Sequence, residues 1–202
     1  MPKEITESRV LVVEGKDEEL FFGALISHLG LEGVEIRPIG GKTVTRPQLA
    51  ALKSDPGFAQ VTCLAIVRDA DTDPGAAFQS VCDALRAAGL PVPERTLVRA
   101  GRDPQVAVMI VPDEDTPGAL EDLCLAAVAG DPAMTCVEQY LQCLEKQGIP
   151  LSHHEAKGKI HAFLASRPEP DRRLGEAAQK GYWPWDDRAF ERARTFLQLV
   201  CS

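Results

Sequence analysis

Two short apolar runs, each closed by acidic residues, constrain the fold of this chain more than any other feature. The first run spans residues 9–13 and is followed by Glu14; the second spans residues 61–67 and is followed by Asp69 and Asp71. A helical pattern comes after each run, and this alternation is typical of parallel strands covered on both faces. In such sheets, ligands bind beyond the carboxyl ends of the strands. The acids therefore mark the edge where we expect a functional site.

The spacing of these acids predicts that they share a cation. Glu14 and Glu18 lie four residues apart across the entry to the first expected helix, so both can face one cleft. Asp69 and Asp71 lie two apart at a strand end, where alternate side chains point the same way. Carboxylates gathered in this way repel one another unless a cation lies between them. Because the set contains only oxygen ligands, Mg²⁺ or Mn²⁺ is favoured over zinc.

The bulk properties indicate a globular protein of the cytoplasm. The chain has 202 residues, enough for one large domain with a sizeable core, and its formal charge of -8 argues against a surface that coats DNA non-specifically. We find no apolar window long enough to cross a membrane and no signal peptide at the polar N-terminus. Most of the six cysteines lie in apolar surroundings, which favours buried, reduced thiols.

The order of expected elements indicates an α/β fold, a Rossmannoid parallel sheet with helices on both faces and a helical C-terminal extension. Strands are expected at residues 9–13, 34–39, 61–67, 96–99 and 106–111. Helices are expected at residues 17–29, 45–53, 75–88, 119–129, 134–146, 154–166 and 189–200. No Pro/Gly/Ser linker marks the change of character near residue 115. We therefore expect residues 116–202 to pack on an α/β core formed by residues 1–115.

A family resemblance rests on the combination of Glu14-Gly15 after the first strand with Asp69-Ala70-Asp71 after a later strand. This combination resembles the Toprim domain of topoisomerases, primases and recombination-associated nucleases over about residues 8–112. More narrowly, the chain is similar to small stand-alone bacterial proteins related to the Toprim half of the OLD (overcoming lysogenization defect) nucleases. The resemblance implies a Toprim-like fold and metal-dependent cleavage of phosphodiesters.

The OLD resemblance also implies a set of metal ligands. In that group an acid follows the first glutamate by four residues, and a late Leu-Glu supplies another ligand. The implied ligands here are Glu14, Glu18, Asp69, Asp71 and Glu121. One Mg²⁺ or Mn²⁺ would be held by Glu14, Asp69 and Asp71, and a second would lie near Glu18 and Glu121, an arrangement suited to in-line phosphoryl transfer. The OLD pattern often has a serine two residues before the last glutamate, where this chain has Ala119.

Two kinds of lysine are candidates for contact with substrate. OLD-like nucleases have a functional lysine downstream of the acidic cluster, and Lys159 or Lys157 would match it; we take Lys159 as the catalytic candidate. Lys16 lies in the loop after the first strand, where it either contacts phosphate or is an exposed loop lysine. The chain contains no GxxxxGK[ST] motif, so an ATPase would have to be a separate partner.

Simpler structural roles compete with functional ones at several positions. Asp73-Pro74-Gly75 is typical of a helix start with an N-cap. The acidic run at residues 113–115 is typical of a solvated turn. The aromatic residues of segment 181–186 either stack on bases or anchor a loop to the body. Taken alone, Glu18 or Glu121 is as consistent with a solvated surface residue as with a metal ligand.

We therefore predict a Mg²⁺- or Mn²⁺-dependent nuclease that acts on DNA or RNA in phage defence or nucleic-acid repair. The alternative is a non-catalytic Toprim-like subunit that binds nucleic acid or works through a partner protein. Intact Glu14, Asp69 and Asp71 favour the enzyme, whereas the acidic composition and Ala119 favour the subunit. Nucleic acid is the expected partner in both cases, and a homodimer is compatible with either.

Overall fold

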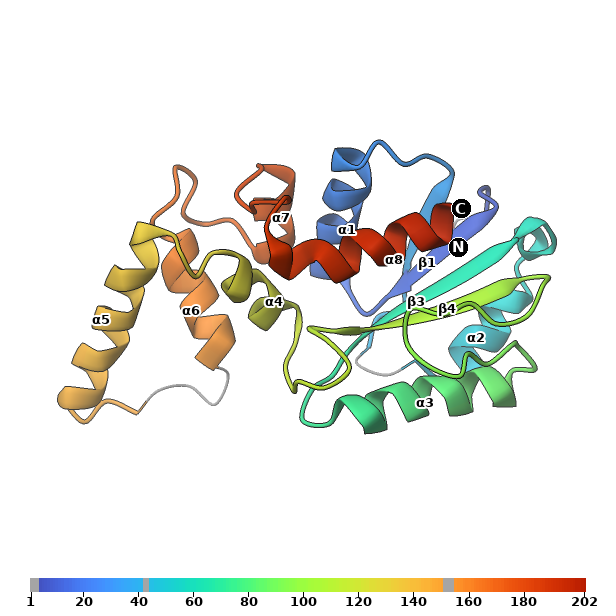
Figure 1. Cartoon of the computed structure of the whole chain (residues 1–202), viewed down its shortest axis with the longest axis horizontal. Coiled ribbons are helices and arrows are strands. Elements are labelled where there is room, and N and C mark those ends of the chain that lie inside the picture. Colours follow the sequence, from blue (N-terminus) through green and yellow to red (C-terminus); the bar gives the residue numbers. More distant parts are fainter. Residues whose placement is uncertain (1–3, 42–43, 151–154) are drawn as a thin grey trace.

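A four-stranded parallel sheet flanked by helices forms the body of the molecule (Figure 1). The computed structural model describes residues 4–41, 44–150 and 155–202. Its helices and strands are β1 (Arg9–Val13), α1 (Lys16–His28), β2 (Val34–Pro38), α2 (Arg46–Lys53), β3 (Cys63–Asp69), α3 (Pro74–Ala87), β4 (Gln105–Val111), α4 (Leu120–Ala127), α5 (Pro132–Lys146), α6 (Glu155–Leu164), α7 (Leu174–Gln179) and α8 (Glu191–Cys201). Short 3₁₀ helices lie at Pro56–Gln60 and Arg188–Phe190. The predicted α/β class is confirmed.

The strand order places the two acid-bearing strands side by side. The order is β2-β1-β3-β4, and β1 pairs with both β2 and β3 in parallel. Val12 lies opposite Ile66 in the β1–β3 register, and Asp69 lies opposite Val111 in the β3–β4 register. Because neighbouring parallel strands end at the same edge, the residues that follow β1 and β3 are brought together there.

Alternation along the strands divides the apolar side chains into two cores. On one face Leu11 and Val13 pack with Phe21 and Leu25 of α1, and α8 lies over the same face (Figure 1). On the other face Val12 packs with residues of α2 and α3. Every strand residue from Val10 to Val13 and from Leu64 to Ile66 is 0% exposed, so the sheet is covered on both sides. Full burial of such side chains stabilises the fold by about 1.5–3 kcal/mol each.

The helices after residue 116 share the core on the α1 face. Helix α7 packs closely on α1, since a Cβ on Gly175 would lie 2.5 Å from the Asp17 carbonyl oxygen. The indole N–H of Trp183 donates to the carbonyl of Leu174 over 3.2 Å, and Trp185 is also buried. The aromatic segment therefore anchors a loop to the body, and its two indole rings are buried instead of being available to stack on bases.

Helices α5 and α6 project away from the sheet (Figure 1). Their position leaves Cys136 and Cys143 of α5 exposed, so the expectation of buried thiols fails for these two, whereas Cys63, Cys82 and Cys124 are buried. Within the described ranges, no helix has the length and apolar character needed to span a membrane.

The segment expected to form a strand at residues 96–99 forms a turn instead. Leu97 adopts a positive φ of 57°, which strand geometry does not allow. Its N–H donates to the carbonyl of Val108 over 2.9 Å, and an isolated antiparallel bridge joins Ala100 to Val106. Helix α7 was not expected, because six residues are too few to show a helical period.

Candidate active site

A hollow of about 680 Å³ opens where the carboxyl ends of β1 and β3 meet the start of α4. Its acidic side chains come from four segments that are distant in sequence. They are Glu14, Asp69, Asp71, Glu121, Asp122 and Glu155. The first four are acids that the sequence singled out, and we call this hollow the acidic cleft.

Glu14 is held at the floor of the cleft by two donors. Its Oε1 accepts the N–H of Asp69 over 3.2 Å and forms an ion pair with the guanidinium of Arg68. The Glu14 side chain is only 12% exposed, and this burial raises the pKa of its carboxyl even though the charge of Arg68 lowers it. Glu14 therefore cannot swing freely into solvent.

Asp69 shows most directly that acids converge here. It ends β3 and is half-buried. Burial raises the pKa of Asp69 to about 8, and the negative charges of Glu14, Glu18 and Glu121 add to the shift, while Arg68 opposes it. A carboxyl shifted this far holds a proton at neutral pH unless a cation offsets the neighbouring charges.

Asp71 reaches the cleft by a route other than strand alternation. Its φ is +50°, so the chain leaves β geometry before this residue. Its N–H and carbonyl each bond to Gly118 over 2.8 Å, and this bridge brings the start of α4, with Glu121 in its first turn, to the edge of the sheet. The Asp71 carboxylate accepts a hydrogen bond from Arg68 over 2.6 Å.

Glu18 lies beside the cleft and also has a structural task. Its Oε2 accepts the N–H of Gly15 over 2.9 Å at the start of α1. Burial raises its pKa, and the charges of Asp17 and Glu121 act in the same direction. Lys16, the predicted phosphate contact, has a side chain that is 67% exposed and pairs with Glu19 over 3.0 Å; it does not line the acidic cleft.

The donor chemistry of the cleft suits a hard divalent cation, because its ligating atoms are carboxylate oxygens. The carboxylates are not gathered around one point, however. In the part of the chain that the structure describes, no group of three or more His, Cys, Asp or Glu side chains is arranged to hold a metal ion. Instead, the guanidinium of Arg68 forms ion pairs with Glu14 and Asp71.

The sequence did not identify Arg68 as part of the site. One signal was present: Arg68 is a charged residue inside the apolar run that precedes Asp69. With the β1–β3 register continued two places beyond Val12 and Ile66, Arg68 falls opposite Glu14. That relation becomes visible only when the pairing of the two strands is known.

The two candidate lysines lie in different surroundings. Lys157 lines the acidic cleft. Lys159 pairs with Glu138 over 3.1 Å and with Glu155 over 2.9 Å, and it lines a separate hollow against α4 and α5. His153 and His154, which precede these lysines in the sequence, lie outside the described residues.

The residues for which the sequence favoured structural roles have such roles. Asp73 caps α3, since its carboxylate accepts the N–H of Ala76 over 2.9 Å. Asp113 closes a turn by accepting the N–H groups of Asp115 and Thr116. These acids do not line the acidic cleft.

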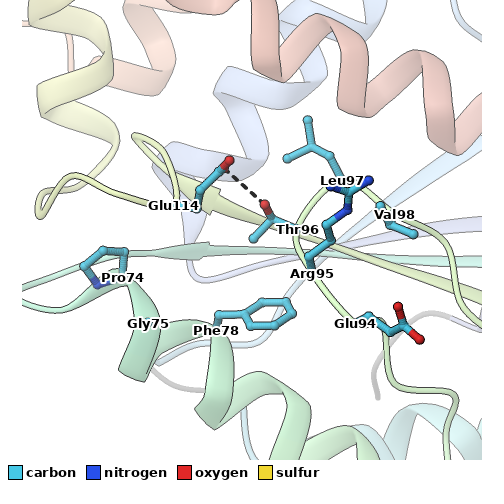
Figure 2. A pocket seen from close by; sticks show the side chains of 9 residues that line it. All are labelled: Pro74, Gly75, Phe78, Glu94, Arg95, Thr96, Leu97, Val98 and Glu114. Atoms are coloured by element: carbon cyan, nitrogen blue, oxygen red, sulfur yellow. Dashed lines mark hydrogen bonds between the residues drawn. The ribbon is translucent and has the colours of Figure 1, made fainter.

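A second hollow, of about 470 Å³, lies between the start of α3 and the turn at residues 94–98 (Figure 2). Figure 2 shows Phe78 facing this turn, and the hydroxyl of Thr96 donates to Glu114 over 3.1 Å. The predicted site residues do not line it. We therefore keep the acidic cleft as the candidate site.

Comparison with known proteins supports the fold assignment. Residues 8–202 match the model of a family described as "Protein of unknown function (DUF3226)". No curated protein matches the chain. The structure is similar to the C-terminal region of the Burkholderia pseudomallei OLD protein, with a TM-score of 0.57 and 13% identity over 97% of this chain and 98% of that one.

A second similar structure is the C-terminal region of the Xanthomonas campestris pv. campestris OLD protein, at a TM-score of 0.46 and 17% identity, covering 97% of this chain and 95% of that one. The predicted likeness to the Toprim half of OLD proteins is thus confirmed at the level of fold by the Burkholderia structure. At this identity the likeness carries the fold alone.

Proposed function

This chain belongs to the family described as "Protein of unknown function (DUF3226)", and we propose that it is a Mg²⁺- or Mn²⁺-dependent nuclease that cleaves DNA or RNA in its acidic cleft. One observation carries the proposal: Glu14, Asp69, Asp71 and Glu121 line the same hollow at the carboxyl edge of the sheet. Acids with no functional partner would be expected to spread into solvent, because their mutual repulsion destabilises the folded state.

The acidic residues would act as metal ligands, with Glu14, Asp69 and Asp71 as the principal set and Glu18 and Glu121 as a second group. The raised pKa of Asp69 supports this, since a cation is the simplest way to restore its charge near pH 7. A divalent cation bound there would activate water and stabilise charge on the phosphate during cleavage.

The basic side chains around the cleft suit a phosphate backbone. A further hollow of about 360 Å³ shares Glu121 and Lys157 with the acidic cleft and is also lined by His161 and Arg173. A strand that entered the cleft would pass these exposed side chains, and Lys157 is the one best placed to contact the scissile phosphate. Lys159 remains the alternative catalytic lysine, and Lys16 a more distant phosphate contact.

A partner-dependent binding subunit is the second candidate. The contacts that favour it are those of Arg68, which forms ion pairs with Glu14 and Asp71 within the protein itself. In that case nucleic acid would still bind near Lys157, but cleavage would need a separate protein, such as an ATPase. A role in phage defence or repair is open to both candidates, as is a homodimer.

Plasmid nicking and RNA degradation separate the two candidates. Purified protein is expected to cleave with Mn²⁺ and more weakly with Mg²⁺, and EDTA should stop the reaction. Asp71→Ala should lower the rate by orders of magnitude, because loss of a primary ligand removes charge stabilisation from the transition state. Glu121→Ala should have an intermediate effect, since Ala119 replaces the serine of the OLD pattern.

Asp73→Ala is the matched control, because Asp73 is only two residues from Asp71 but caps a helix. It should keep most of the activity and lose about 1 kcal/mol of stability. Cleavage that survives Asp71→Ala would point to contamination or to another site. A protein that binds Mn²⁺ but cleaves neither DNA nor RNA would favour the partner-dependent subunit.

A further inference from the structure

Arg68 has an environment unlike that of any other charged residue in the described ranges. It is 6% exposed, and it is the one charged side chain there that falls in the buried class. Burial of a guanidinium is costly unless its charge is matched, so a partner is required. Arg68 occupies the penultimate position of β3, immediately before Asp69. A residue with this burial and position should have a specific task at the site.

The contacts of Arg68 are with two of the proposed metal ligands. Nη1 forms an ion pair with Glu14, and Nη2 donates to Asp71 over 2.6 Å. Glu14 is 12% exposed and Asp71 44% exposed, so the first pair is shielded from solvent and the second is partly open to it. One carboxylate oxygen of Glu14 and one of Asp71 are therefore already engaged by a fixed cation, because arginine does not lose its proton in proteins.

The backbone makes this arrangement difficult to avoid. Arg68 follows Ile66 on the face that packs against α2 and α3, whereas Asp69 follows Val67 on the face of α1. The register between Val12 and Ile66 places Glu14 opposite Arg68, and the left-handed turn at Asp71 brings its carboxylate back to the same guanidinium. The pairing thus follows from the strand register.

We propose that Arg68 is an internal counter-ion that pairs with both Glu14 and Asp71 in the metal-free protein and competes with the divalent cation for their oxygens. This inference rests on the proposed function, since it takes these acids as metal ligands. A guanidinium at hydrogen-bond distance from two ligands repels an incoming cation and holds lone pairs that the cation needs. The protein would then bind metal weakly by itself, and a bound phosphate group could draw Arg68 away from Glu14 and Asp71.

Direct measurement of Mn²⁺ affinity tests this competition without reference to cleavage. Free and bound Mn²⁺ are counted by electron paramagnetic resonance for the wild type, Arg68→Gln and Arg68→Lys, with circular dichroism to verify that each is folded. Arg68→Gln removes the charge and should bind Mn²⁺ roughly tenfold more tightly or better. Arg68→Lys keeps the charge and should stay closer to the wild type, which protects the test if Arg68→Gln folds poorly.

The matched control is Arg86→Gln, since Arg86 lies on α3 and pairs with Asp83 at the surface, where its side chain is 62% exposed. Its Mn²⁺ affinity should equal that of the wild type. Equal or weaker binding by folded Arg68→Gln would overturn the inference and make Arg68 a residue that orients Glu14 for the metal. If neither the wild type nor Arg68→Gln bound Mn²⁺, both the inference and the proposed metal-dependent function would fall.

Discussion

The main-chain N–H of Asp69 donates a 3.2 Å hydrogen bond to Oε1 of Glu14, and this bond ties together the ends of β3 and β1. It fixes one carboxylate beside the backbone that carries the other. Both side chains are thereby held in a partly buried place where charge is costly. The stability of the metal-free protein should therefore depend on pH in a way that Asp69 dominates.

Stability without metal should fall as pH rises from mildly acidic to mildly basic. The pKa of Asp69 is raised from 3.8 to about 8 by burial and by neighbouring carboxylates. As pH rises, Asp69 therefore ionises at a lower pH in the unfolded chain than in the folded protein. Between those two values the folded state binds more protons than the unfolded chain, and the free energy of unfolding decreases with pH. The raised pKa values of Glu14 and Glu18 act with the same sign.

Urea unfolding in EDTA measures this effect. Between about pH 5.5 and pH 8, the contribution of Asp69 amounts to about 3 kcal/mol, since each pH unit is worth about 1.4 kcal/mol. Asp69→Asn cannot ionise, so its stability should fall by much less over the same range. Parallel losses in the wild type and the variant would mean that Asp69 is already ionised at pH 5.5.

Metal should relieve the repulsion that this pH dependence reports. Mg²⁺ or Mn²⁺ should raise the melting temperature of the wild type, because a ligand that binds only the folded state stabilises it. Asp69→Asn should lose much of this response and be slightly more stable than the wild type in EDTA. Asp73→Asn, which alters an N-cap outside the cleft, should keep the full response. An undiminished response in Asp69→Asn would place the ion elsewhere.

The bridge between Asp71 and Gly118 should be as important as the acids that it positions. Gly118 has a φ of +143°, and a Cβ there would lie 2.8 Å from Oδ2 of Asp122, which accepts the N–H of Ala119. Gly118→Ala should therefore cost about 1–3 kcal/mol of stability and displace Glu121 at the start of α4.

Thermal melts and the nicking assay check Gly118→Ala together. Both stability and cleavage should fall, and the drop in cleavage should persist at temperatures where the variant is fully folded. Gly130→Ala is the control, since a Cβ at Gly130 meets nothing within 4 Å and φ is not positive there. A Gly118→Ala variant with normal stability would show that α4 adjusts freely.

Local pattern was sufficient to predict the strands that build the site. Apolar runs closed by Glu14 and Asp69 can be read from the sequence because a strand buried on both faces needs consecutive apolar residues. The segment at residues 96–99 has the composition of a strand but forms a turn, since Leu97 bonds to Val108 with a positive φ. That outcome depends on tertiary contacts, which composition does not encode.

The parts of the site that escaped prediction depend on register or on short elements. Arg68 meets Glu14 only because β1 and β3 pair in one particular register. Asp71 was expected to point with Asp69 by strand alternation, yet it reaches the cleft through a left-handed turn that bonds to Gly118. Neither relation leaves a periodic trace in the sequence, so pattern analysis could not find them.

The two candidate lysines can be separated by single substitutions. Lys157 lines the acidic cleft, whereas Lys159 is bound to Glu138 and Glu155 and helps to join α6 to α5. Lys157→Ala should therefore reduce cleavage at least tenfold, because it removes a positive charge near the phosphate, and should leave the melting temperature nearly unchanged. Lys159→Ala should leave most of the cleavage and lower stability by up to about 1 kcal/mol, since the ion pairs that it breaks are partly exposed.

Lys157→Arg keeps the charge and should retain part of the activity. The opposite result, with cleavage lost in Lys159→Ala and kept in Lys157→Ala, would mean that Lys159 leaves Glu138 and Glu155 to reach the substrate when nucleic acid binds.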